Sequence, residues 1–255
     1  METDDEVLLR QRVDRFVQEL TDSLCAVVPP EEARFRVEGR RGDQGPILTI
    51  RQFDELGIPL LAAGEPLFRL QVRLQCSWNT MASVEHRYLA ISSSTYKVFV
   101  PQAPGAPLFT FDYLRDAGSR IPVAHLNVHA HRDEVVFAML NAGRAGRGKR
   151  RAKEIEKTGR IPRLADLHFP LGGHRFRPCL EDVLEMLITE FGVDPAARNW
   201  RARLQRGRAR YRVTQLRTAA SDDLESVADL LEERGYRIER PERRPGRRDD
   251  RLSAY

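Results

Sequence analysis

The chain has few cysteines, and their placement excludes a disulfide framework. Cys25, Cys76 and Cys179 are odd in number, widely spaced and set among apolar residues. Small disulfide-stapled domains carry a dense, even set of cysteines, and metal-binding pairs lie only a few residues apart. We therefore expect three reduced structural thiols in a cytoplasmic protein.

Long apolar runs are missing as well. A membrane-spanning helix needs about 20 consecutive apolar residues, and no run in the chain approaches this length. The first residues include Glu2, Asp4, Asp5 and Glu6, whereas a secretory signal begins with basic residues. With 41% hydrophobic and 31% charged residues, the composition predicts a soluble globular protein without a membrane partner.

Lysine is scarce although the chain is basic. Only Lys97, Lys149, Lys153 and Lys157 are lysines among 42 basic residues, and the net charge is +5. A basic protein can bind polyanions, but an arginine excess also follows from GC-rich coding. The clustering of the basic residues is therefore more informative than their number.

Alternating apolar and polar residues predict an antiparallel sheet across about residues 35–131. The expected strands lie at 35–37, 47–50, 67–78, 88–100, 108–113 and 124–131. Short connections between successive strands favour a meander over parallel βαβ units. An amphipathic helix at 6–28 should pack on the apolar face of strand 67–78. The expected fold class is α+β, with a mostly helical, arginine-rich C-terminal half.

Three parts of the chain differ in pattern. Residues 1–132 carry the N-terminal helix and the sheet, and 133–239 form a helical basic region on or beside it. Residues 240–255 are rich in proline and arginine, and we expect them to be disordered.

Local signals divide the helical region further. Ser221 is the expected N-cap of a helix that ends at Gly235. Its buried stripe would consist of Leu224, Val227, Leu230 and Leu231. Residues 236–239 could add an edge strand.

Histidines gather on one face of the last expected strand. His125, His129 and His131 share that face because side chains alternate along a strand. The Cα atoms of His129 and His131 are then ~6.6 Å apart, which lets both imidazoles reach one zinc, manganese or nickel ion. The Cα atom of His125 lies ~13 Å from that of His129, so His125 could bind the same ion only if the strand were bent.

Other residues could complete this metal site. His168 and His174, in one later loop, are the candidate third ligands. Asp112, on the preceding expected strand, could be a ligand or could orient an imidazole.

The same histidines also support metal-free chemistry. Two imidazoles with pKa values near 6.5 can share general-acid and general-base roles, which suits RNA cleavage through the 2′-OH. His129 and His131 would act with help from His125, and Arg132, Arg175 or Arg177 would stabilise the phosphorane charge. The alternative is that these histidines only form a solvated polar face.

Two basic segments, the run 144–153 and the helix 198–217, are candidates for nucleic-acid contact. The candidate contact residues are Arg144, Arg147, Lys149, Arg150, Arg151, Arg175, Arg177, Arg203 and Arg210. Trp200 and Tyr211 could stack on bases. The alternative is a solvated basic face.

Two functions follow from these features. The first is a hydrolase, most simply a nuclease that acts on RNA. Its catalysis would use either a divalent metal or histidine acid–base chemistry alone. The second is a non-catalytic intracellular module that binds nucleic acid or a protein partner. A distance below ~10 Å from His168 or His174 to the His129–His131 pair would favour the first. The oligomeric state stays open.

Overall fold

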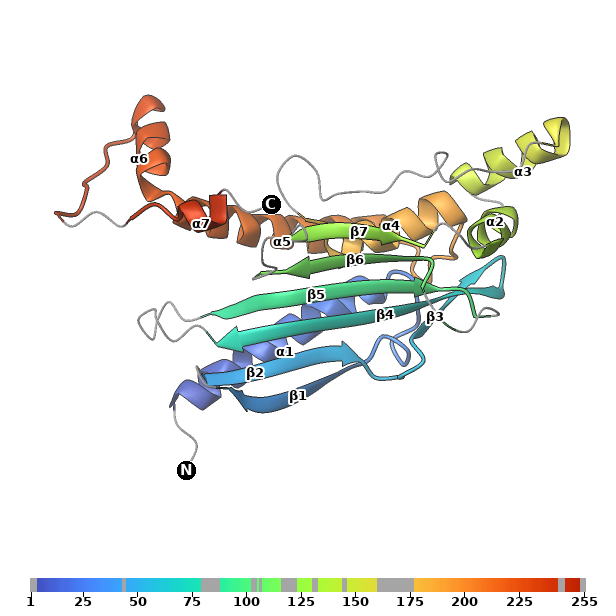
Figure 1. Cartoon of the computed structure of the whole chain (residues 1–255), viewed down its shortest axis with the longest axis horizontal. Coiled ribbons are helices and arrows are strands. Elements are labelled where there is room, and N and C mark those ends of the chain that lie inside the picture. The colour runs from blue at the N-terminus through green and yellow to red at the C-terminus, as the bar shows by residue number, and fades with distance from the viewer. Residues whose placement is uncertain are drawn as a thin grey trace.

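A seven-stranded sheet forms the centre of the computed structural model (Figure 1). The structure describes residues 4–42, 45–78, 88–101, 105, 107–115, 123–129, 133–143, 146–159, 177–242 and 246–252. The strands are β1 (Phe35–Gly42), β2 (Gly45–Gln52), β3 (Ile58–Ala62), β4 (Glu65–Trp78), β5 (Leu89–Phe99), β6 (Phe109–Leu114) and β7 (Ala124–Val128). The helices are α1 (Asp4–Leu24), α2 (Asp133–Leu140), α3 (Gly146–Thr158), α4 (Leu180–Phe191), α5 (Trp200–Asp222), α6 (Leu224–Glu233) and α7 (Asp249–Leu252). The predicted α+β class is confirmed.

The sheet is an antiparallel meander with one interruption. Its order is β1-β2-β4-β5-β6-β7, and β3 pairs with the beginning of β4. The register passes from Arg51 opposite Arg73 to Ile58 opposite Leu70, so β2 and β3 lie end to end along one edge of β4. Sequence patterns missed β3, because a five-residue strand that contains Pro59 gives a weak signal.

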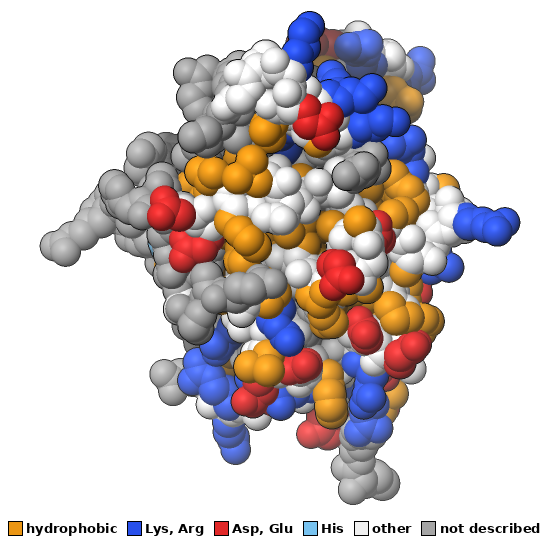
Figure 2. Space-filling model, turned by 90° about the vertical axis from the view of Figure 1, so that its right-hand side faces the viewer, with side chains coloured by type: hydrophobic (Ala, Val, Ile, Leu, Met, Phe, Trp, Pro, Cys, Tyr) orange, Lys and Arg blue, Asp and Glu red, His pale blue; other side chains and the backbone are white. Residues whose placement is uncertain are grey.

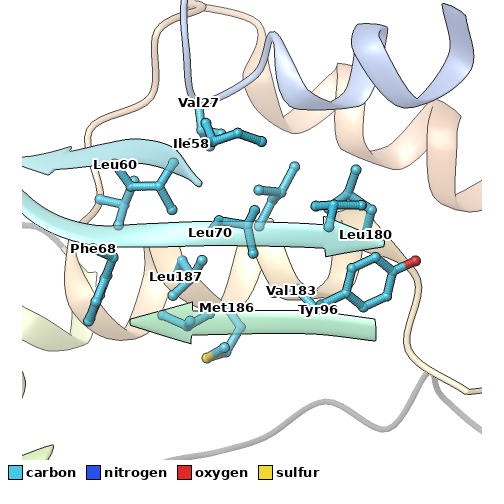
Figure 3. Packing of buried hydrophobic residues seen from close by; sticks show 14 of the residues in the cluster. Val27, Ile58, Leu60, Phe68, Leu70, Tyr96, Leu180, Val183, Met186 and Leu187 are labelled. Carbon is cyan, nitrogen blue, oxygen red and sulfur yellow. The ribbon is translucent and has the colours of Figure 1, made fainter. Parts of the chain in front are cut away.

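The alternation of β4 separates a packed face from a polar face. Phe68, Leu70 and Val72 are fully buried, while Arg69 and Arg73 point to the other side. The apolar side chains share one core with Leu20 and Leu24 of α1 and with Leu180, Val183 and Leu187 of α4 (Figure 3). The expected packing of the N-terminal helix on this face is confirmed.

Helix α4 lies at the centre of the helical layer. Its N-terminus is closed by a capping box in which the Cys179 N–H donates to the Asp182 carboxylate at 3.1 Å. Its C-terminus is closed by Gly192, whose φ of 69° is the left-handed conformation that glycine favours. The capped helix fixes where its first residues, which include Glu181, meet α1 and α5.

Three local expectations are wrong at the C-terminal end. Ser221 lies inside α5, and the cap of α6 is Asp223, which accepts from the Ser226 N–H at 3.0 Å. No residue of α6 is buried, because α5 extends beyond the sheet and holds α6 away from it (Figure 1). Residues 236–239 form no strand. Residues 240–255, expected to be disordered, include the four-residue helix α7.

None of the helices within the described ranges combines the length and apolar character that crossing a bilayer requires.

Candidate functional site

A polar cluster surrounds His125 on the face of the sheet away from the helices. His125 on β7 lies opposite Asp112 on β6, with 3.9 Å between Nε2 and Oδ2. Asp112 accepts hydrogen bonds from Thr95 Oγ1 at 2.8 Å and from Asn127 Nδ2 at 3.2 Å. These bonds hold the carboxylate beside the imidazole, the arrangement expected of an orienting acid.

The rest of the predicted histidine site is only partly visible. β7 ends at Val128, earlier than predicted, and the His129 N–H donates to the Leu108 carbonyl at 3.0 Å. The other predicted members of the site lie outside the described residues: His131, Arg132, His168, His174 and Arg175. Among the residues that are described, no three His, Cys, Asp or Glu side chains gather as a metal site would require. The metal site therefore stays a prediction.

The basic run divides between surface and interior. Lys149 and Arg150 are exposed on α3, where basic side chains gather at the top of Figure 2. Arg151 is 9% exposed, and its guanidinium pairs with the Glu190 carboxylate and carbonyl on α4. Arg151 therefore anchors α3 and is not available to a polyanion, whereas Arg147 lies in α3 and Arg144 lies outside the described residues.

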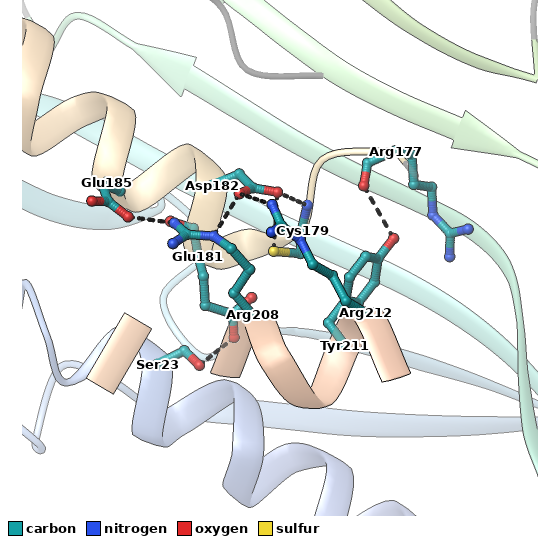
Figure 4. A network of polar contacts seen from close by, with 9 residues as sticks. All are labelled: Ser23, Arg177, Cys179, Glu181, Asp182, Glu185, Arg208, Tyr211 and Arg212. Carbon is teal, nitrogen blue, oxygen red and sulfur yellow. Dashed lines mark hydrogen bonds and ion pairs between the residues drawn. The ribbon is translucent and has the colours of Figure 1, made fainter. Parts of the chain in front are cut away.

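Several arginines of α5 also have protein partners. Arg208 pairs with Asp182 at 2.8 Å and with Glu185 (Figure 4). Arg203 donates to Asn199 Oδ1 at 3.1 Å. These contacts attach α5 to α4 and stabilise its own first turn, so the arginine density of α5 is partly structural.

A pocket of about 400 Å³ lies between α1, α5 and the helix-facing side of β4, β5 and β6. Its polar and aromatic lining consists of Arg12, Arg15, Arg115, Arg177, Arg210, Tyr88, Tyr96, Tyr113, Tyr211, Glu19 and Glu181. Of these residues, only Arg177, Arg210 and Tyr211 were predicted from the sequence to bind a ligand. Four of the six tyrosines of the chain line this pocket. Two of them, Tyr96 and Tyr113, occupy core-facing positions of strands, and such polar-tipped rings on the core side are the sequence signal that could have indicated the pocket.

The pocket is electropositive. Arg12, Arg15 and Arg115 form no ion pair with any described carboxylate, and Arg210 lies 3.9 Å from Glu19. Arg177 stacks on Tyr113, with 3.7 Å from Cζ to the ring centroid. Five arginines thus face two carboxylates.

Two tyrosine hydroxyls remain protonated inside the pocket. Burial raises the pKa of Tyr96 well above its ordinary value, and burial likewise raises the pKa of Tyr211. The Tyr211 hydroxyl donates to the Arg177 carbonyl at 3.4 Å. Both hydroxyls are therefore neutral donors near neutral pH.

The sheet separates the histidine cluster from the pocket. Asp112 and Tyr113 are successive residues of β6, so their side chains point to opposite faces. Arg177 contacts Tyr113, and it therefore lies on the side away from His125. Helix α3 is distant from both, because it contacts the C-terminal end of α4 whereas the pocket lies at the N-terminal end. The predicted residues that the structure describes are thus spread over the histidine face, the pocket and α3, with Arg203 in the first turn of α5.

No protein-family model, no curated protein and no solved structure matches this chain. The inferred function therefore depends on the geometry alone.

Proposed function

We propose that the protein binds single-stranded nucleic acid, RNA in particular, through the pocket between α1 and α5. The observation that carries this proposal is the combination of unpaired arginines and tyrosine rings in one cavity. Arginine forks match phosphate oxygens, and tyrosine faces stack on unpaired bases. A volume of about 400 Å³ accepts roughly one nucleotide, which excludes a base pair in its helix.

The arrangement of the lining residues favours a nucleic-acid strand that runs across the opening of the pocket. Arg15 and Tyr88 are exposed, whereas Tyr96 is buried on the pocket floor. A base that enters the pocket leaves its phosphates near Arg12 and Arg15 of α1. The excess of positive charge attracts the strand from solution and makes binding salt-dependent.

Binding of a labelled eight-nucleotide RNA, measured by fluorescence anisotropy, tests the proposal. The logarithm of the affinity should fall linearly with the logarithm of salt concentration, by about 0.7 for each neutralised phosphate. Replacing Arg12 and Arg15 together by alanine should weaken binding by about 10-fold or more and flatten this slope.

The matched control replaces Lys149 and Arg150 by alanine, which removes the same charge from exposed positions of α3. This control should retain most of the affinity. An equal loss in both double variants would show that only net charge matters, and no binding at low salt would refute the proposal. Single-stranded DNA and duplex RNA, measured in parallel, report the preference for RNA and for single strands.

A second candidate function, RNA cleavage at the histidine face, is favoured by the position of Asp112 beside His125. His125→Ala and His129→Ala should each abolish cleavage of a labelled RNA while leaving its salt-dependent binding unchanged. Cleavage that survives both substitutions would refute this candidate, and a dependence on added zinc, manganese or nickel would identify the metal version.

A further inference from the structure

The inner wall of the pocket carries a buried carboxylate without a cation. Glu181 is 7% exposed and lines the pocket at the first turn of α4. Its carboxylate accepts a hydrogen bond from the Ser23 hydroxyl, but no described lysine or arginine forms an ion pair with it. Figure 4 shows Arg208 directed at Asp182 and Glu185 instead.

Three helices hold this carboxylate in place. Glu181 of α4 meets Ser23 of α1 and the backbone of Gly207 on α5. A Cβ at position 207 would overlap Glu181 Oε1 and lie 2.7 Å from Ser23 Oγ. The helix N-terminus stabilises the negative charge, and two carboxylate oxygens offer about four lone pairs, of which Ser23 uses one. The remaining acceptors are preorganised on the pocket wall.

A second polar group on the pocket floor also has no partner. Tyr96 is 5% exposed, and its hydroxyl makes no hydrogen bond to the part of the chain that is described. Figure 3 shows this oxygen beyond the labelled aliphatic side chains, past Leu180 at the start of α4. Tyr211, Cys179, Glu181 and Arg177 are close enough to influence its pKa electrostatically. The oxygen is not among the fully enclosed atoms without a partner, so it opens on the pocket and is available to donate to a ligand.

We propose that the inner end of the pocket selects guanine, with Glu181 accepting from the N1–H and N2–H groups and Tyr96 donating to O6. Guanine alone among the four RNA bases presents two adjacent N–H donors beside a carbonyl. Adenine and cytosine each place a ring acceptor next to the amine, which a carboxylate repels, and uracil has no amine. The assignment rests on the proposed function, because the phosphate of the same nucleotide would lie toward Arg12 and Arg15.

Titration calorimetry with GMP, IMP, AMP, CMP and UMP tests the assignment on the full chain. GMP should bind about 10- to 100-fold more tightly than UMP, AMP or CMP, since a bidentate contact contributes that much discrimination. IMP, which lacks the 2-amino group, should lie between GMP and the others. Equal affinities for all five would overturn the guanine assignment and leave the proposed function standing, whereas no binding of any mononucleotide or oligonucleotide would overturn both.

Two substitutions locate the recognition. Glu181→Gln should reduce the GMP-to-UMP affinity ratio by about 10-fold without weakening UMP, because an amide cannot accept both donors. The matched control is Glu19→Gln at the rim of the pocket, which should leave the ratio unchanged. A ratio that survives Glu181→Gln would overturn the assignment.

Tyr96→Phe gives an independent readout if Glu181→Gln fails to fold. It removes one hydroxyl from the pocket floor and should lower GMP affinity by about 5-fold, with UMP unaffected. An unchanged GMP-to-UMP ratio in this variant would likewise overturn the assignment.

Discussion

At the scale of single residues, Arg151 shows how position within one run changes the role of an arginine. Its neighbours Lys149 and Arg150 reach solvent, but Arg151 turns toward α4 and pairs with Glu190. Its guanidinium also lies over the Phe191 ring, 6.0 Å from the centroid. A buried pair is costly to break because one charge then remains without a partner.

We expect Arg151→Ala to lower the free energy of unfolding by about 3 kcal/mol, because it removes the guanidinium that pairs with the buried Glu190 carboxylate. Urea denaturation measures this value. Arg150→Ala, one residue earlier and exposed, should change stability by less than about 0.5 kcal/mol. Equal effects of the two substitutions would show that the Arg151–Glu190 pair contributes nothing.

The cysteines follow the expectation from composition among the described residues. All three are free thiols, and Cys76 and Cys179 are buried. Burial raises the pKa of Cys76 to about 12, and burial also raises the pKa of Cys179. These two thiols stay protonated and unreactive near neutral pH.

At the scale of elements, the close crossing of three helices depends on one glycine. Gly207 is buried in α5 where it faces Ser23 of α1 and Glu181 of α4. Glycine is a poor helix former, so its place at the eighth position of a 23-residue helix reflects the little space that the crossing allows.

Gly207→Ala should therefore destabilise the protein by about 1–3 kcal/mol despite the better helix propensity of alanine. Thermal or urea unfolding provides the measurement. The reverse exchange at an exposed position of the same helix, Ala202→Gly, should cost about 1 kcal/mol through propensity alone. A stabilising effect of Gly207→Ala would mean that the helices can separate without cost.

Element patterns predicted packing where one face is buried. The alternation of 67–78 identified the face of β4 that packs on the helices, and the apolar spacing of 180–191 identified α4. The same reasoning was wrong for α6, which is an amphipathic helix but has no buried residue. Periodicity reports that a helix has an apolar side, and only the path of α5 decides whether that side meets the core.

At the scale of the whole molecule, α6 and α7 lie outside the packed body (Figure 1). The core residues come from α1, the sheet, α2, α4 and the first turns of α5. Leu224 and Leu230 of α6 are 47% and 51% exposed. The body should not depend on this C-terminal part for its stability.

A chain that ends after Asp222 should therefore unfold with a free energy within about 1 kcal/mol of the full chain. Urea denaturation of both chains, monitored by tryptophan fluorescence, makes the comparison because both tryptophans remain. A loss above about 2 kcal/mol would contradict the prediction and indicate that α6 covers part of the core in solution.

The amino-acid sequence by itself determined the fold class, most strands, α1, α4 and the free thiols. These features are local: alternation, helical spacing and apolar context are written in consecutive residues. The sequence also placed Asp112 on the strand beside the histidine strand, because successive strands of a meander lie side by side.

Only the tertiary structure decided which distant residues meet. It separated Arg177 from His125 by the thickness of a sheet and turned Arg151 inward. It brought Arg12 and Glu181, far apart in the chain, to one pocket. The physical reason is that such a pocket forms where helices that are far apart in the sequence pack on the same sheet. No local sequence pattern specifies which helix lies over which strand.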